Sequence, residues 1–254
     1  MGLIPEIHGM SLLGKRKEQQ DSFGFRSYED RGFAVVCDGM GGLCDGRRAS
    51  QGVVETLLSL YQNKLPTQSF PEFFHESLDY MDEYVYRLNR GKPGNRSGTT
   101  VIAVAIEAGK LYWFSVGDSR IYFLRKGDLL CATKDHNYKY FLTHLKQKGA
   151  ISSEYYDQEV LRKGSALISY VGMKGEHLID SNPSPFLLES GDMILLVSDG
   201  IYRTISEDKM KEIANCSYSA AEIMERICSA VTQKQYPNQD NATIVAIQMK
   251  KEQL

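Results

Sequence analysis

The sequence lacks the features that mark nucleic-acid-binding, membrane-spanning and secreted proteins. Its 254 residues carry a formal net charge of -2, whereas a nucleic-acid-binding protein usually has a strong basic excess. No apolar run approaches the roughly 18 residues that a membrane-spanning helix needs, and residues 1–10 lack the apolar core of a signal peptide. We therefore expect a cytoplasmic protein that binds neither nucleic acid nor membranes.

Cysteine is scarce, and histidine forms no metal-binding pattern. The five cysteines are an odd number, and no two of them form a Cys-x-x-Cys pair. This argues against a disulfide framework and against a zinc ribbon. The spacing of metal ligands is also missing among His8, His75, His144 and His177.

Short β-rich runs alternate with helical patterns along the chain. Apolar residues at the helical period predict helices over 49–61, 70–88 and 220–231. Strands are predicted at 22–25, 33–37, 99–106, 110–116, 120–124, 186–188, 193–197 and 243–247. The short connections between them favour antiparallel pairing. The order of the elements therefore predicts antiparallel sheets covered by helices, and no linker divides the chain.

Aspartates lie at the ends of these apolar runs. Asp38, Asp118 and Asp199 each follow a strand-like run, and Asp240 precedes one. Taken singly, each reads as ordinary turn chemistry. Taken together, strands that end in carboxylates bring negative charges to one edge of a sheet, and such charges repel one another unless a cation neutralises them. Oxygen ligands of this kind suit Mg²⁺ or Mn²⁺. Gly39 is expected to let the backbone turn sharply after Asp38, so that its carbonyl could also face a metal.

The motifs that contain these aspartates resemble those of a known family. They are Gly14-x-Arg16-x-x-x-Gln20-Asp21, Asp38-Gly39-Met40-Gly41-Gly42, Ser97-Gly98-Thr99-Thr100, Val116-Gly117-Asp118-Ser119-Arg120, Thr133-x-Asp135-His136, Gly191-Asp192, Ser198-Asp199-Gly200 and Asp240-Asn241-Ala242-Thr243. Their types and order are similar to those of the metal-dependent serine/threonine protein phosphatases, the protein phosphatase 2C family, in its bacterial form. The resemblance extends from about Gly9 to Met249.

The fold that the resemblance implies agrees with the antiparallel sheets and covering helices predicted above. The family fold is an α+β, four-layer α-β-β-α sandwich, in which two antiparallel sheets are flanked by helices. We expect residues 1–254 to form a single catalytic domain of this type. A flap segment, at about 137–170, is expected beside the active site.

The resemblance also implies a role for particular residues. Two Mn²⁺ or Mg²⁺ ions are expected, bridged by Asp38, and a third is implied as an additional, weaker position. Carried over by position, the metal-binding residues are Asp21, Asp38, Gly39, Asp118, Asp199 and Asp240. Arg16 is expected to bind the substrate phosphate and, with Asp38, to form the catalytic pair. The implied reaction is attack by a metal-bridging water on phosphoserine or phosphothreonine, without a phosphoenzyme.

The sequence departs from the family pattern in the loop after Asp38. Met40 and Leu43 stand where relatives carry histidines, so the identity of the general acid stays open. A second hypothesis is a catalytically inactive binding module of the same fold, although Asp38, Asp199 and Asp240 are all retained. His136 is expected to be a structural hydrogen-bonding residue.

The expected partners follow from the implied reaction. We expect phosphoprotein substrates and a cognate serine/threonine kinase whose signalling the enzyme reverses. A monomer is the expected oligomeric state.

Overall fold

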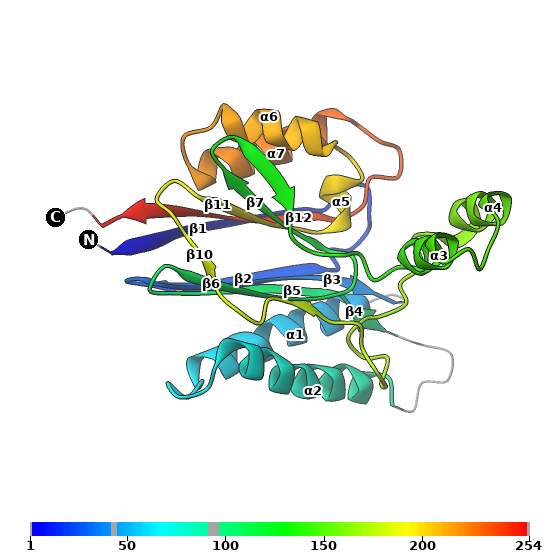
Figure 1. Ribbon diagram of the computed structural model, residues 1–254, viewed down its shortest axis with the longest axis horizontal. Coiled ribbons are helices and arrows are strands. Elements are labelled where there is room, and N and C mark those ends of the chain that lie inside the picture. Colours follow the sequence, from blue (N-terminus) through cyan, green and yellow to red (C-terminus); the bar gives the residue numbers. More distant parts are fainter. Residues whose placement is uncertain (1, 42–44, 91–96, 253–254) are drawn as a thin grey trace.

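The computed structural model describes residues 2–41, 45–90 and 97–252, and its centre is a pair of antiparallel sheets that lie face to face (Figure 1). In the first sheet the strand order is β1 (Leu3–Leu12), β12 (Ala242–Lys251), β11 (Met193–Val197), β7 (Arg120–Arg125) and β8 (Asp128–Cys131). In the second sheet it is β10 (Phe186–Leu187), β6 (Lys110–Val116), β5 (Val101–Glu107), β3 (Arg31–Met40) and β2 (Asp21–Tyr28). Two short strands extend the second sheet: β4 (Gly98–Thr99) pairs with β3, and β9 (Asp180–Ser181) pairs with β6.

Helices cover the outer face of each sheet (Figure 1). The second sheet is covered by α1 (Asp45–Gln62) and α2 (Phe70–Leu88), and the first by α5 (Asp199–Tyr202), α6 (Glu207–Asn215) and α7 (Ala220–Gln233). A further pair, α3 (Tyr138–Gln147) and α4 (Ser153–Lys163), projects from one end of the sandwich and lies within the expected flap segment. The predicted four-layer α-β-β-α architecture is confirmed.

Strand β3 shows why the sandwich needs three separate apolar layers. Its alternate residues Phe33 and Val35 pack against α1 and α2, whereas Ala34 and Val36 pack against the first sheet. All four side chains have no exposed surface. A strand buried on both faces reads as a continuous apolar run, which is why residues 33–37 carried no alternation of apolar and polar side chains.

The sequence reasoning missed several elements. It did not predict strand β1, because its half-buried residues mix apolar and polar types without a clean period. Pairing with β12 along the whole of its length is what makes this segment a strand. Also missed were β8, the short strands β4 and β9, and helices α3, α4, α5 and α6.

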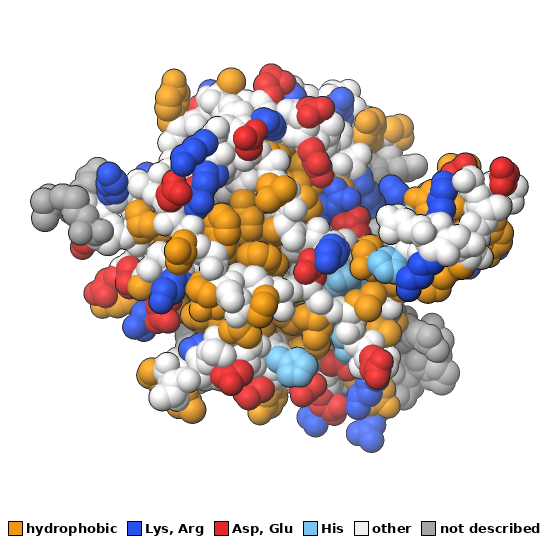
Figure 2. Space-filling model, in the orientation of Figure 1, with side chains coloured by type: hydrophobic (Ala, Val, Ile, Leu, Met, Phe, Trp, Pro, Cys, Tyr) orange, Lys and Arg blue, Asp and Glu red, His pale blue; other side chains and the backbone are white. Residues whose placement is uncertain are grey.

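Hydrophobic side chains remain exposed along one side of the sandwich. Leu130 of β8 is 66% exposed and Leu187 of β10 is 65% exposed, and both lie on the outermost strands of their sheets. Figure 2 shows hydrophobic side chains gathered over the middle of this face, between the two helical layers. Among the residues that the structure describes, no helix is long and apolar enough to cross a membrane.

A partly buried ion pair fastens the chain that leads into β9 onto helix α2. The Asp82 carboxylate accepts a hydrogen bond from the Gly172 backbone N–H at 2.6 Å and lies 3.0 Å from His177 Nε2. The two side chains are only 12% and 7% exposed. The hydrogen bond to Asp82 raises the pKa of His177, and the net effect of the environment lowers the pKa of Asp82 although burial opposes this.

These pKa shifts predict a pH-dependent contribution to stability. Because the folded-state pKa of His177 is raised, its contribution is fully present below about pH 6.5 and is lost as the pH rises through the folded-state pKa. The contribution of Asp82 is lost in the opposite direction, as the pH falls below about 3.8. We expect His177→Gln to lower the free energy of unfolding by about 1–2 kcal/mol near pH 5.5 and by less near pH 8.

Urea denaturation at the two pH values measures this difference. The matched control is His75→Gln, since His75 is exposed on the same helix that carries Asp82. An equal loss of stability for His177→Gln at both pH values would contradict the proposed role of the ion pair.

Candidate metal centre

Two of the predicted aspartates come from adjacent strands of the second sheet. Asp21 begins β2, Asp38 lies near the end of β3, and the two residues are direct partners in the strand pairing. The pairing of β2 with β3 extends one residue further, because the Gly39 N–H donates a hydrogen bond to the Gln20 carbonyl at 3.1 Å. Neighbouring strands therefore deliver two carboxylates to the same edge of the sheet.

The other three aspartates come from the ends of strands in the first sheet and from a turn that joins the two sheets. Asp199 follows β11 as the first residue of α5, Asp118 lies in the turn between β6 and β7, and Asp240 precedes β12. Ser198 connects the two sheets at this point. Its hydroxyl donates to Asp21 Oδ2 at 2.7 Å and accepts a hydrogen bond from the Thr243 N–H at 2.9 Å.

These carboxylates lie near enough to one another to shift one another's pKa. Burial raises the pKa of Asp38 well above its ordinary range, and the negative charges of Asp21, Asp199, Asp118 and Asp240 raise it further. The pKa of Asp21 rises to about 6, through burial and then the charges of Asp199 and Asp240, although hydrogen bonds from Ser198 and Thr243 oppose the shift. Burial also raises the pKa of Asp199, and the charge of Asp240 adds to the rise, although the positive charge of Arg203 opposes it.

The donor set fits hard divalent cations. Asp21 Oδ1 is buried and has no hydrogen-bond partner among the described residues, so one buried carboxylate oxygen has a lone pair available for a further ligand. Carboxylate oxygens are the ligands that Mg²⁺ and Mn²⁺ prefer. Within residues 2–41, 45–90 and 97–252, no group of three or more His, Cys, Asp or Glu side chains is arranged so that it could hold a metal ion. Two guanidinium groups neutralise part of the negative charge of these aspartates.

Two arginines pair with the aspartates at the rim of the site. Arg16 Nη2 lies 2.6 Å from Asp240 Oδ2, and both side chains are partly exposed. Arg203 reaches two carboxylates at once, with Nη2 at 2.9 Å from Asp118 Oδ2 and Nη1 at 3.0 Å from Asp199 Oδ2. Burial and Asp199 raise the pKa of Asp118 to about 6, while the positive charge of Arg203 opposes the rise.

Arg203 is a site residue that the sequence reasoning missed. Asp199 is the first residue of the short helix α5, and Arg203 caps its C-terminal end. Residues four apart lie on the same face of a helix, so the Arg203 side chain returns to Asp199. That spacing was visible in the sequence. Its second partner, Asp118, is 85 residues away in the chain, and only the fold reveals that contact.

The Ser97-Gly98-Thr99-Thr100 motif holds the backbone of Asp38. Thr100 Oγ1 accepts a hydrogen bond from the Asp38 N–H at 3.0 Å, and the Asp38 carbonyl accepts from Thr99 Oγ1 and from the Thr100 N–H, each at 2.9 Å. Thr100 Oγ1 is also 2.8 Å from Ser119 Oγ, beside Asp118. The motif therefore fixes the position of the central aspartate.

The glycines after Asp38 and Asp199 are needed for close backbone approach. A Cβ atom on Gly39 would lie 2.1 Å from the Gly46 carbonyl oxygen, and one on Gly200 would lie 1.9 Å from that of Asn241. The expectation that Gly39 allows a sharp turn was wrong, because β3 continues through it to Met40. The change of direction comes at Gly41, whose φ is 143°. Leu43, together with Gly42 and Cys44, lies outside the described residues.

The remaining motif residues are structural. His136 Nδ1 accepts a hydrogen bond from the Gly117 N–H at 3.1 Å, next to Asp118, and burial lowers the pKa of His136. Arg120 holds Asp135 by two parallel hydrogen bonds of 2.9 and 2.8 Å. Asp192 accepts from Arg125 at 2.8 and 2.6 Å and so connects β7 with the start of β11. The structural reading of His136 agrees with these contacts.

Bacterial protein phosphatases are similar to this chain in sequence. The serine/threonine phosphatase Stp of Listeria monocytogenes is 26% identical over 239 residues, which cover 92% of this chain and 91% of the relative. The protein phosphatase PhpP of Streptococcus pneumoniae is 26% identical over 251 residues, covering 97% and 98%.

Solved structures share the fold. The catalytic domain of the serine/threonine protein phosphatase PstP, crystallised with two manganese ions, has a TM-score of 0.76 at 24% identity and covers 98% of this chain and 100% of its own. The serine/threonine phosphatase of S. agalactiae has a TM-score of 0.81 at 23% identity and covers 96% and 99%. The protein phosphatase 2C family model matches residues 8–241, so the chain belongs to the protein phosphatase 2C family.

Proposed function

We propose that this member of the family removes phosphate from phosphoserine and phosphothreonine in proteins, in a reaction that needs two Mn²⁺ or Mg²⁺ ions. The observation that carries the proposal is the meeting of aspartates from both sheets at one edge of the sandwich, where their charges raise one another's pKa. The two manganese ions in the PstP catalytic domain support the number of ions.

Each aspartate has a proposed role toward the ions. Asp38, which lies at the centre of the mutual repulsion, would help to hold both ions, with the Gly39 carbonyl as a further ligand. Asp199 and Asp240 would help to hold one of the ions, and Asp21 would hold water at the site. Asp118 is the candidate ligand for a third ion. When bound, divalent cations neutralise the phosphate dianion and acidify a water nucleophile.

Arg16 is proposed to bind and orient the substrate phosphate. Its side chain is 57% exposed, and among the described residues it pairs with Asp240 alone. A guanidinium can hold a phosphate through two parallel hydrogen bonds, which fixes the phosphoryl group for in-line attack. Stabilisation of charge on the phosphoryl oxygens then comes from Arg16 and the cations together.

The proposed biological setting is bacterial signalling. The relatives are bacterial phosphatases, so we infer that the chain, as a cytoplasmic monomer, reverses a cognate serine/threonine kinase by acting on phosphoproteins. An inactive binding module of the same fold is the alternative. The retention of Asp38, Asp199 and Asp240, with their paired arginines, disfavours it.

Hydrolysis of p-nitrophenyl phosphate tests the reaction. We expect hydrolysis with Mn²⁺ and the loss of hydrolysis in EDTA. For Asp38→Asn we expect kcat to fall at least about 100-fold, because the Asp38 carboxylate is the proposed ligand of both ions. Asp208→Asn, at an exposed position in the first turn of α6, is the matched control. Activity that survives both EDTA and Asp38→Asn would rule out the metal mechanism, and inactivity on every phosphopeptide would favour the binding module.

Binding of the ions is measurable without turnover. Because the carboxylates repel one another, a bound cation stabilises the folded chain, and Mn²⁺ at about 100 times its Kd should add about 2.7 kcal/mol to the free energy of unfolding. We expect the Mn²⁺-induced rise in the urea midpoint to disappear in Asp38→Asn and to persist in Asp208→Asn. An unchanged midpoint for the native sequence across a Mn²⁺ titration would contradict the proposed centre.

Arg203 is expected to compete with any third cation. Its guanidinium already spans Asp118 and Asp199, at 2.9 and 3.0 Å. Isothermal titration calorimetry should find two Mn²⁺ ions per chain in the native sequence and an additional, weaker ion in Arg203→Gln. If the native chain already binds three ions, and Arg203→Gln leaves that number unchanged, the competition does not occur.

A further inference from the structure

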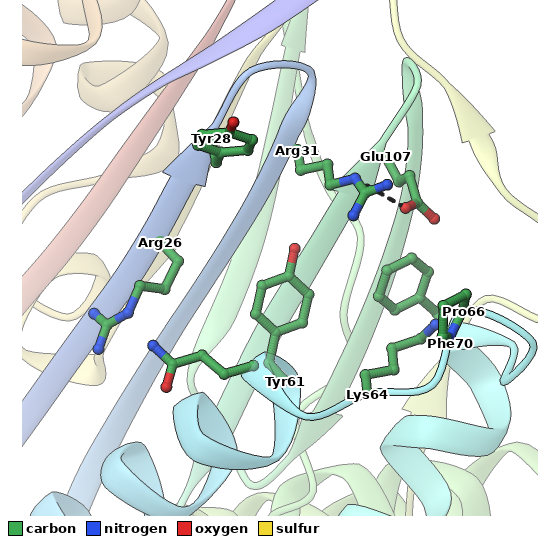
Figure 3. A pocket seen from close by; sticks show the side chains of 9 residues that line it. Arg26, Tyr28, Arg31, Tyr61, Lys64, Pro66, Phe70 and Glu107 are labelled. Atoms are coloured by element: carbon green, nitrogen blue, oxygen red, sulfur yellow. Dashed lines mark ion pairs between the residues drawn. The ribbon is translucent and has the colours of Figure 1, made fainter.

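A second pocket lies at the opposite end of the strands that carry Asp21 and Asp38. Its volume is about 310 Å³, and its walls come from β2, β3, β5, the end of α1 and the start of α2 (Figure 3). Tyr28 and Asp21 are the last and first residues of β2, so the two sites are separated by about 23 Å along the strand. Nothing in the proposed phosphatase mechanism uses this end of the sheet.

The pocket exists because the sheet extends beyond the helix that covers it. A Cβ atom on Gly24 would contact Leu58 and Val54 of α1, so this face of β2 lies under the helix. Side chains alternate along a strand, and Arg26 and Tyr28 therefore point to the same face. Helix α1 ends at Gln62, which leaves these two side chains beyond its cover.

Cationic side chains outnumber carboxylates among the residues that line the pocket. Three cationic side chains, those of Arg26, Arg31 and Lys64, line it together with the single carboxylate of Glu107. Arg31 contacts Glu107 through Nε at 3.2 Å, and its guanidinium carries further N–H donors on its two terminal nitrogens. In the part of the chain that the structure describes, neither Arg26 nor Lys64 forms an ion pair; each donates to a backbone carbonyl, at 2.9 and 3.1 Å respectively.

Aromatic rings provide the rest of the surface. The Tyr61 ring stacks on Phe33, with the ring centroids 4.3 Å apart, and this contact fixes its orientation. In Figure 3 its hydroxyl is directed toward Arg31, with Tyr28 on one side and Phe70 on the other. Tyr28 is 71% exposed, while the ammonium of Lys64 lies 4.6 Å from the centroid of the buried Phe70 ring.

We propose that this pocket binds a small phosphate ester that carries a planar ring, the chemical class of the nucleoside monophosphates. Guanidinium and ammonium groups are suited to a phosphate, with Arg31 offering a fork of donors. A flat, apolar ring is suited to stacking on tyrosine. The volume lies at the low end of the range for small-molecule sites, about 300 to 1,000 Å³, which fits one nucleotide and not a folded partner.

The position of the pocket makes its occupancy independent of the metal centre. Arg31 and Asp38 lie seven residues apart on β3, or about 23 Å along an extended strand. A ligand in the pocket therefore does not exclude substrate from the metal centre. Inhibition of hydrolysis that is purely competitive would place the ligand at the metal centre instead.

Isothermal titration calorimetry on the full chain with Mn²⁺ tests the proposal. The probe is the methylenephosphonate analogue of adenosine 5′-monophosphate, which a phosphatase cannot hydrolyse, with inorganic phosphate and adenosine as partial ligands. We expect the analogue to bind at least tenfold more tightly than either part. Arg31→Gln and Lys64→Gln should each weaken its binding about tenfold or more, and neither should change the hydrolysis of p-nitrophenyl phosphate.

Two further variants distinguish binding in this pocket from binding elsewhere on the protein. Arg90→Gln removes the same charge from an exposed position outside the pocket and should bind the analogue like the native chain. Arg16→Gln alters the proposed phosphate site at the metal centre and should also leave this binding unchanged. The proposal is overturned if the analogue does not bind, if adenosine binds equally well, if Arg90→Gln weakens binding as much as Arg31→Gln, or if only Arg16→Gln weakens it.

Discussion

Repulsion among aspartates at one end of the sandwich is the constraint on which the rest of the structure depends. Asp38 lies with Asp21 and Asp199 where burial and like charge both disfavour ionisation. The chain offsets this cost with the hydroxyl of Ser198 and with two arginines, Arg16 and Arg203. Divalent cations complete the neutralisation in the proposed mechanism. A cluster of this kind persists only if the surrounding structure holds each carboxylate in place.

The double-sheet architecture provides that support. Each sheet contributes part of the aspartate set, so the site exists only where the two sheets meet. Ser198 bonds Asp21 of one sheet and the Thr243 backbone of the other, and Thr99 and Thr100 hold the Asp38 backbone. The close approach of neighbouring chain segments excludes even one methyl group at Gly39 and Gly200. The glycine, serine and threonine residues beside the aspartates therefore hold the carboxylates in position.

The same strands carry opposite charges at their two ends. β2 runs from Asp21 to Arg26 and Tyr28, and β3 runs from Arg31 to Asp38. One end carries carboxylates, and the other carries cationic side chains and aromatic rings. Helices α1 and α2 cover the apolar middle of the sheet, so both proposed sites lie at its ends.

The sequence by itself determined the type of fold and the family, and it predicted the main aspartates, because all three depend on local signals. Asp38 and Asp199 end strongly apolar runs, and the motifs occur in a specific order. The tertiary structure alone decided which distant residues meet. Arg203 reaches Asp118 across 85 residues, Ser198 reaches Asp21 across 177, and β1 becomes a strand only by pairing with β12. Such contacts depend on strand register and on the packing of two sheets, and no short stretch of sequence contains that information.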